Sequence, residues 1–282
     1  MPFSSTGAIP LGARSERLSK YLQTTPAFTD AVAAAGCGFV AHRFAEEHPE
    51  HFRLRARESG AELGCGFTGE TLRFDDGWRL VDAHPQPSPP YASALDALAS
   101  QVAEDLAVVV RHADEGDEVC AIYLCAANHW AAEDKIGRSF FAVHAPVPGI
   151  DPINRNAYRM VRIMEGRGPF VRFVWGLATD TRLNHHPEPP PGIAAEAWRG
   201  RRFEAAAPSL FVRVERQVTW GFPEARASLF AIRNSFRDGQ AVRADAALNA
   251  ALCSALASMD AHQAQYKGVA HSREAILAWL RA

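Results

Sequence analysis

The spacing of apolar residues predicts two main helices in the first half of the chain. Leucine and valine recur at three- and four-residue intervals between Ser93 and His112, which predicts a helix with one apolar face. Thr29 or Asp30 is placed to cap another helix that runs to about Glu47, where Pro49 helps to end it. Further helices are predicted at residues 14–21, 131–137, 154–165, 245–263 and 271–281.

Alternation of apolar and polar residues, interrupted by glycine-rich turns, predicts the strands. They are expected within residues 53–82 and at 118–125, 139–144, 169–177, 210–220 and 228–236. Residues 169–177 carry Arg172 on one face and Trp175 on the other. In residues 210–220, Arg216 shares a face with valines and Trp220, whereas the opposite face carries Arg213, Glu215, Gln217 and Thr219.

These elements predict an α+β fold. Consecutive strands, with helices before, between and after them, are typical of a mostly antiparallel sheet flanked by helices. The proline-rich segment 84–90 is a predicted loop and a candidate boundary. It would separate an N-terminal arm, helix and strand layer (1–90) from a core with C-terminal helices (91–282), unless both form one continuous domain.

Composition excludes several classes of protein. The 282 residues carry a formal net charge of −2 with mixed signs, which does not indicate nucleic-acid binding. No apolar run approaches the roughly 20 residues that cross a bilayer, and the N-terminus lacks the pattern of a secretory signal. Five scattered cysteines argue against a disulfide framework. We expect a soluble cytoplasmic protein with reduced thiols, and the sequence leaves a homo-oligomer open.

His144 is the residue that most clearly suggests chemistry. It follows the apolar run 139–143 and precedes Pro146 and Pro148, so its backbone is expected to be stiff. Alternation places it on the side of Phe140 and Ala142, facing apolar space. Two interpretations stay open: a neutral core histidine bonded to a backbone carbonyl, or a ligand presented to a buried group, as the proximal histidine of haem proteins is.

Other constellations are weaker. Arg216 and Arg172 each suggest either a structural ion pair or an anchor for a carboxylate. Cys120, Cys125 and His129 lack the spacing of a zinc site. The chain contains no G-x-S-x-G nucleophile elbow and no glycine-rich nucleotide loop.

Four segments together resemble a known family. They are W-x-x-E-D-K-I-G at 130–137, V-H-A-P-V-P-G at 143–149, V-R-F-V-W at 171–175 and R-V-E-R-Q at 213–217. Their order and separation are similar to those of the haem-dependent oxidative N-demethylase family, over residues from about Leu80 to Tyr266 and Lys267.

The resemblance implies a PAS-like domain that binds haem b through an axial histidine. Its described member demethylates a secondary amine with dioxygen, and its NADPH electrons arrive through flavin and iron–sulfur partner subunits. On this sequence, His144 would be the iron ligand, and Arg172, Arg216 and Lys135 would contact the cofactor. His129, Trp130 and Trp175 would line or support the reaction site. No cysteine spacing here suggests an iron–sulfur cluster, so a separate reductase would supply the electrons.

The sequence departs from the family pattern in two segments. Ala127 and Asn128 stand where a Pro-Ser pair is expected before the tryptophan, and Val174 replaces an asparagine. Both lie near the expected cavity, so the substrate need not be dimethylamine. The alternative function is a non-catalytic haem or small-molecule binding or sensor protein, although the sequence shows no signalling output domain.

Overall fold

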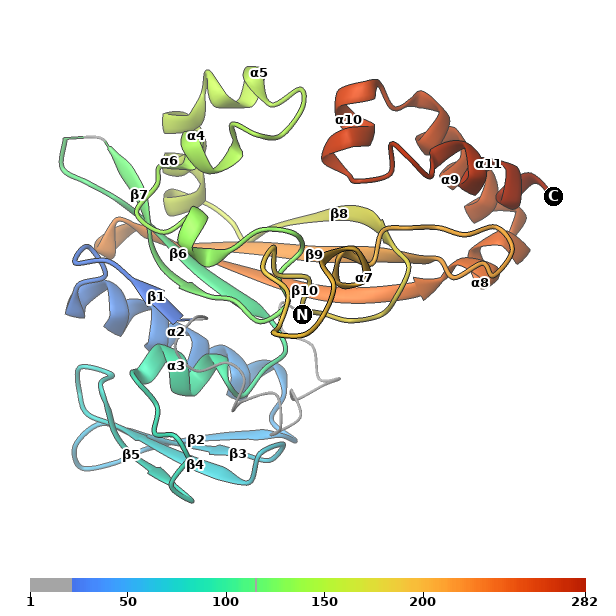
Figure 1. Ribbon diagram of the computed structural model, residues 1–282. Coiled ribbons are helices and arrows are strands. Elements are labelled where there is room, and N and C mark those ends of the chain that lie inside the picture. Colours follow the sequence, from blue (N-terminus) through green and yellow to red (C-terminus); the bar gives the residue numbers. More distant parts are fainter. Residues whose placement is uncertain (1–21, 115) are drawn as a thin grey trace.

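The computed structural model describes residues 22–114 and 116–282. It confirms the mixed helix and sheet class, with two antiparallel sheets flanked by helices (Figure 1). The predicted helix at residues 14–21 lies outside the described residues. No helix among the described residues is long and apolar enough to cross a bilayer.

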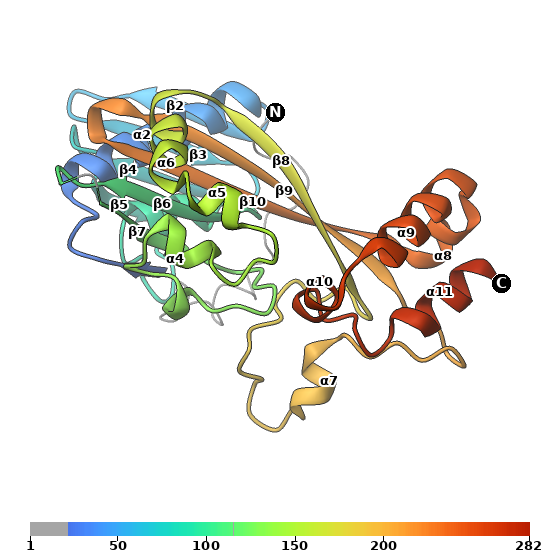
Figure 2. The same cartoon turned by 90° about the horizontal axis from the view of Figure 1, so that it is seen from above.

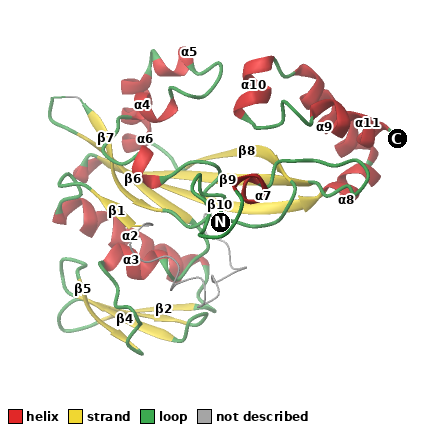
Figure 3. Ribbon diagram, viewed as in Figure 1, coloured by secondary structure: helices red, strands yellow, loops and turns green. Residues whose placement is uncertain are grey.

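The larger sheet has six strands in the order β1-β7-β6-β10-β9-β8 (Figure 3). Their bounds are β1 (Leu22–Thr24), β6 (Asp105–Arg111), β7 (Asp117–Tyr123), β8 (Phe170–Ala178), β9 (Phe211–Phe222) and β10 (Ala227–Asp238). The 3-10 turn η2 (Pro223–Ala225) joins β9 to β10, which pair along their whole length. The sequence prediction of an antiparallel pair after a tight connection is therefore confirmed.

The smaller sheet lies on the far side of two helices. It contains β2 (Phe52–Ala56), β3 (Ala61–Cys65), β4 (Glu70–Phe74) and β5 (Leu80–His84). Between the sheets run α2 (Asp30–Glu47), capped by Thr29 as predicted, and α3 (Ala94–Ala99) (Figure 1). Phe44, Leu72 and Leu229 are completely buried in the core that these layers share. This core includes residues from both sides of residue 90, and the division of the chain there stays a prediction.

Helices also cover the other face of the six-stranded sheet (Figure 2). The 3-10 turn η1 (Ala132–Asp134), α4 (Phe140–His144), α5 (Asp151–Asn154) and α6 (Ala157–Gly166) lie towards the β6–β7 end. At the other end lie α7 (Ala195–Arg199), α8 (Gly239–Ala244), α9 (Ala246–Ser258), α10 (Ala261–Tyr266) and α11 (Arg273–Arg281). The predicted helix 245–263 is divided, because Asp260 caps α10 with a capping box to Gln263.

The prediction of one helix from Ser93 to His112 is wrong beyond residue 99. Residues 105–111 form the inner strand β6, which pairs with β7 on one side and β10 on the other. A run of β-branched valines buried on both faces suits an inner strand. Its apolar spacing in the sequence fits a helix equally well.

The prediction of a strand at residues 139–144 is also wrong. Ser139 caps α4 by accepting a hydrogen bond from the Ala142 N–H at 3.2 Å. Asp117 Oδ1 accepts another from the Phe140 N–H at 2.5 Å. These two acceptors satisfy amide groups that a new helix leaves unpaired. His144 therefore lies in the last turn of a short helix.

The pair Arg111–Glu165 fixes α6 to the sheet and provides a test of this packing. Two hydrogen bonds, of 2.6 and 2.9 Å, join the guanidinium to the carboxylate, and both side chains are mostly buried. Glu165→Ala leaves the arginine without its counter-charge, so we expect the free energy of unfolding to fall by about 3 kcal/mol.

Urea unfolding measures this loss. The exposed Glu196→Ala serves as the control and should change stability by less than about 0.5 kcal/mol. The double change Arg111→Met with Glu165→Leu should recover much of the loss. A Glu165→Ala protein as stable as the control would contradict the role of this pair.

Candidate functional site

The register of β8 and β9 decides which side chains share a face. Arg172 pairs with Gln217, and Val174 pairs with Glu215. Phe173 pairs with Arg216, so Arg216 projects from the opposite face of the sheet. We call the face that carries Arg172, Arg213, Glu215 and Gln217 the polar face. The structure therefore separates two arginines that the sequence analysis assigned to one cofactor.

A continuous row of hydrogen bonds crosses the polar face. The Arg172 Nε–H donates to Gln217 Oε1 at 2.6 Å, and Gln217 Nε2 donates to Glu215 Oε2 at 2.9 Å. The other carboxylate oxygen, Oε1, accepts from Asn128 Nδ2 at 2.8 Å. Glu215 thus binds two neutral amide groups, while the Arg172 guanidinium also lies 5.8 Å from the centre of the Phe230 ring. The row connects the loop before His129 to β8.

His144 has the geometry of a neutral imidazole with one nitrogen available. Its Nδ1 lies 2.8 Å from the Phe140 carbonyl oxygen, which can only accept, so Nδ1 carries the proton and Nε2 keeps its lone pair. Burial lowers the pKa of His144, and the charges of Arg172 and Lys135 lower it further, against the opposing effect of the carbonyl. Both sequence interpretations of His144 are compatible with this arrangement, because the carbonyl bond orients the ring.

Lys135 and Trp130 support the end of α4. Lys135 Nζ donates to the Val143 carbonyl oxygen at 3.3 Å and lies 5.6 Å from the centre of the Trp130 ring. Trp130 packs, half-buried, against the apolar cluster under α4 and α6. The structure therefore brings His144, Lys135, Trp130 and Arg172 into one neighbourhood.

His129 lies in the loop after β7, held by a second loop. It has a positive φ of 63°, and its N–H donates to the His185 carbonyl at 3.0 Å. The two imidazoles stack with ring centres 5.3 Å apart, and Asp180 Oδ1 lies 3.0 Å from His185 Nε2. Burial lowers the pKa of His129 to about 3, and Arg201, His185 and Arg213 add to the effect. His129 is therefore neutral at physiological pH.

Arg213 holds both loops against the sheet. Its side chain is almost completely buried and donates to Asn234 Oδ1 at 2.9 Å, to the Leu183 carbonyl at 3.0 Å and to the Ala126 carbonyl at 2.6 Å. Sequence reasoning missed Arg213 and Glu215 as site residues. The signal was the alternation in R-V-E-R-Q, which places Arg213, Glu215 and Gln217 on one face and the predicted residue Arg216 on the other.

Trp175 lies away from His144, in the C-terminal apolar cluster. Lys267 Nζ donates to the Trp175 carbonyl at 2.6 Å and lies 4.7 Å from the centre of its ring. Trp175 thus fixes the end of α10 to β8. The contact between Lys267 and Trp175 lies in the second half of the edge strand β8. The first half of β8 exposes Phe170 and Phe173 to solvent.

The donor set limits what the site can hold. Within residues 22–114 and 116–282, no group of three or more His, Cys, Asp or Glu side chains is arranged to bind a metal ion. A bare transition-metal ion commonly needs three or four protein ligands. A single histidine is sufficient when a macrocycle supplies the remaining donors.

The chain matches the model of a known protein family. Residues 12–277 match the family model described as haem-dependent oxidative N-demethylase, alpha subunit-like. The match covers nearly the whole chain and includes every candidate site residue considered above.

The lowered pKa of His129 predicts a pH dependence of stability. Between its folded value of about 3 and its ordinary value of 6.5, the unfolded chain binds more protons than the folded one. The free energy of unfolding should therefore fall as pH falls from about 6.5 towards 3, by up to about 1.4 kcal/mol per pH unit for this one group. The stability gained from the lowered pKa of His129 is fully present above pH 6.5.

Urea unfolding between pH 4 and pH 7 measures the effect. His129→Gln should show a shallower loss of stability on acidification than the parent protein, because glutamine does not titrate. His262→Gln, on the exposed side of α10, is the matched control and should follow the parent. If the free energy of unfolding depends on pH in the same way in His129→Gln and in the parent, the pKa of His129 is not lowered.

Proposed function

The chain belongs to the haem-dependent oxidative N-demethylase alpha-subunit-like family, and from this membership we propose that it is the haem-carrying subunit of an enzyme that demethylates a small amine. The observation that carries the proposal is the orientation of His144. Its Nδ1–H is held by the Phe140 carbonyl, so Nε2 is free to bind iron.

The residues around His144 suit haem b in three respects. A carbonyl bonded to the proximal nitrogen fixes the ring and raises its basicity towards a metal. Phe141 on α4 and Phe170 on β8 are 53% and 42% exposed, so apolar surface is available for a porphyrin ring. Arg172 and Lys135 are the cations that influence His144, and they would bind the propionate groups. Arg216 is left out of this site because it projects from the opposite face.

Bound at His144, haem iron would supply the reductive activation of dioxygen and the oxidation of an N-methyl group. The protein residues would bind and orient the amine. His129 is neutral and has no hydrogen bond to its ring from the described residues, so it would line the site as an uncharged side chain, and its pKa of about 3 makes it a weak proton acceptor. The hydroxymethyl amine would collapse to formaldehyde and the demethylated amine as its C–N bond breaks and its hydroxyl proton is transferred to the amine nitrogen. Trp130 would support α4, and Trp175 would hold α10.

We also propose that electrons come from partner proteins. The matched family is described as alpha subunit-like, which is consistent with a multi-subunit enzyme. The sequence carries no recognisable motif for NADPH, flavin or iron–sulfur binding. These cofactors would therefore belong to a separate reductase. In this proposal the six-stranded sheet with α4 to α6 is the PAS-like haem domain.

Haem binding is tested with purified protein reconstituted with haemin. We expect a Soret band for the parent protein and for His262→Ala. His144→Ala should lose the band or shift it strongly, because the axial nitrogen is gone. A parent protein without a Soret band would overturn the haem proposal. A Soret band that is unchanged in His144→Ala would show that another residue binds the iron. His129→Ala would then be tested in the same way.

Catalysis is tested by product formation. Reduced haem-loaded protein is mixed with oxygen and a panel of methylated amines, and formaldehyde is measured. We expect up to one formaldehyde for every two haems, because each turnover needs two electrons and one ferrous haem supplies one, and we expect none from His144→Ala. His129→Gln, which keeps haem but lacks the imidazole, should lower the rate, because it changes a side chain that lines the site. Haem binding without formaldehyde from any amine would favour a binding or sensor role.

A further inference from the structure

The outer side of α6 carries a row of arginines. Arg159 and Arg162 lie three residues apart on this helix, so their side chains project from the same side. Arg155 precedes Arg159 by four residues, and Arg167 directly follows the helix. All four residues are exposed. We call Arg155, Arg159, Arg162 and Arg167 the α6 stripe.

Little negative charge compensates the α6 stripe. Residues 139–169 contain four arginines and two carboxylates, Asp151 and Glu165. Glu165 is mostly buried and is bound to Arg111. Across residues 22–114 and 116–282, no arginine of the stripe forms an ion pair, although Arg162 donates to the Tyr158 hydroxyl at 3.2 Å. Because the whole chain has a net charge of −2, this positive charge is a local property of the surface.

The inner side of α6 packs towards the helix that carries His144. Val161 of α6 and Phe140 of α4 belong to one buried apolar cluster. Figure 1 shows α4, α5 and α6 gathered at one end of the larger sheet. Helices in contact lie about 8–10 Å apart between their axes. A molecule bound to the α6 stripe would therefore be separated from α4 by the width of one helix.

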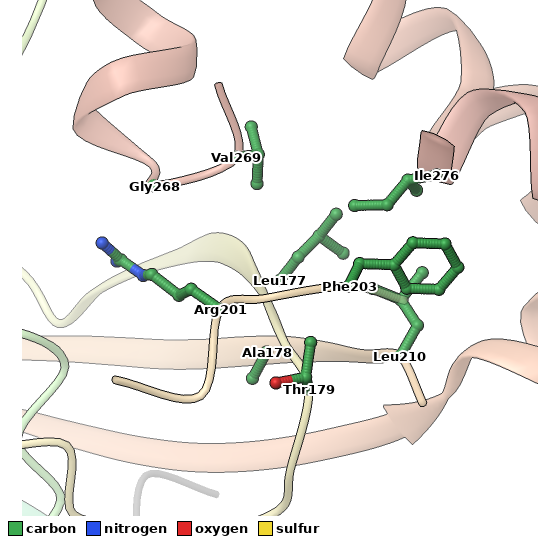
Figure 4. Close-up of a pocket in the computed structure, with 9 residues that line it drawn as sticks. All are labelled: Leu177, Ala178, Thr179, Arg201, Phe203, Leu210, Gly268, Val269 and Ile276. Atoms are coloured by element: carbon green, nitrogen blue, oxygen red, sulfur yellow. The ribbon is translucent and has the colours of Figure 1, made fainter. Parts of the chain in front are cut away.

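The α6 stripe differs from the arginines near the other end of β8. Arg201 is half-buried beside a small hollow that is also lined by Leu177, Phe203 and Ile276 (Figure 4). Its Nε is buried and has no hydrogen bond among the described residues. Arg213 is almost completely buried and donates to three oxygens of this chain. The arginines of the stripe are the ones that another protein can reach.

The side chains around the α6 stripe suit a protein partner better than a lipid surface. Ile163, next to Arg162, is 39% exposed, and the Arg162 guanidinium lies 5.7 Å from the centre of the Tyr158 ring. Arginine and tyrosine beside a small apolar area are typical of protein interfaces. A helix that lies in a membrane surface needs a broad exposed apolar face. The apolar side of α6 is instead buried against its own domain.

We propose that the α6 stripe is the docking surface for an acidic partner protein. Guanidinium groups match the geometry of carboxylates, and a row of unpaired cations steers an acidic surface towards it. Because α6 packs towards the helix of His144, this partner is the protein that delivers electrons. The electron-donor role rests on the proposed function, whereas the docking of an acidic protein on α6 does not.

Docking is measured by calorimetry on the haem-free and the haem-loaded protein. The probe is an acidic plant-type [2Fe–2S] ferredoxin, and the basic protein cytochrome c is the control probe. We expect ferredoxin to bind both forms with equal affinity, which falls at least tenfold between low and physiological salt. Cytochrome c should not bind. The pair Arg159→Glu with Arg162→Glu should weaken ferredoxin binding at least tenfold at low salt.

Two further pairs of substitutions complete the test. Arg159→Gln with Arg162→Gln adds no negative charge beside Glu165, so it decides the result if the glutamate pair is less stable than the parent. Arg53→Glu with Arg55→Glu is the matched control, because it changes the net charge by the same amount. Both of these arginines are exposed on β2 and form no ion pair with a described residue. This control should change the affinity less than threefold.

Electron delivery is measured on the haem-loaded protein. Reduced ferredoxin is mixed with the ferric protein under carbon monoxide, which traps ferrous haem, and the absorption change is followed. We expect the second-order rate to fall at least tenfold in Arg159→Glu with Arg162→Glu. In Arg53→Glu with Arg55→Glu it should fall less than threefold.

Three results would overturn the docking proposal. They are no binding of ferredoxin to the parent, equal binding by the parent and both α6 pairs, or equal losses in the α6 and β2 glutamate pairs. If the parent binds vesicles of phosphatidylserine and phosphatidylcholine in place of ferredoxin, the stripe is a membrane contact. Ferredoxin that docks on α6 without reducing the haem would overturn the electron-donor role alone. A protein that binds no haem would overturn the proposed function, and calorimetry on the haem-free protein would still decide the docking.

Discussion

The buried guanidinium of Arg213 is the contact on which the arrangement of the polar face depends. It joins the strand β9, the adjacent strand β10 through Asn234, and the two loops that carry Ala126 and Leu183. Leaving the donors of a buried arginine unsatisfied costs free energy, so Arg213 favours the assembly of these four segments together. Their assembly places Asn128 on Glu215 and His129 against His185.

The same arrangement explains why both candidate histidines are neutral. Burial lowers the pKa of His144 and of His129, and each has arginines among the charges that act on it. A neutral imidazole can bind iron through a lone pair or accept a proton, whereas a protonated one can do neither. The cations of the polar face thus help to keep both histidines neutral. The sheet supplies the rigid support for both.

Much of the fold could be predicted from the sequence, because local signals are strong where capping and alternation agree. Thr29 begins α2, the β9–β10 pair follows its tight connection, and the strands of the smaller sheet lie within the predicted range. The errors arose where local spacing is ambiguous. Residues 105–111 form a strand because partners on both sides supply hydrogen bonds, and α4 forms because Asp117 and Ser139 accept its first N–H groups.

The sequence by itself determined the α+β class, the family resemblance and the choice of His144, because each depends on residues that are close in the chain or on motifs in a fixed order. Only the tertiary structure decided which residues of R-V-E-R-Q share a face with Arg172. It joined Arg172, Gln217, Glu215 and Asn128 in one row and placed Arg216 on the other face. It also left the buried Nε of Arg201 without a hydrogen bond among the described residues. Whether a charge is satisfied depends on contacts between segments far apart in sequence, and no local pattern contains that information.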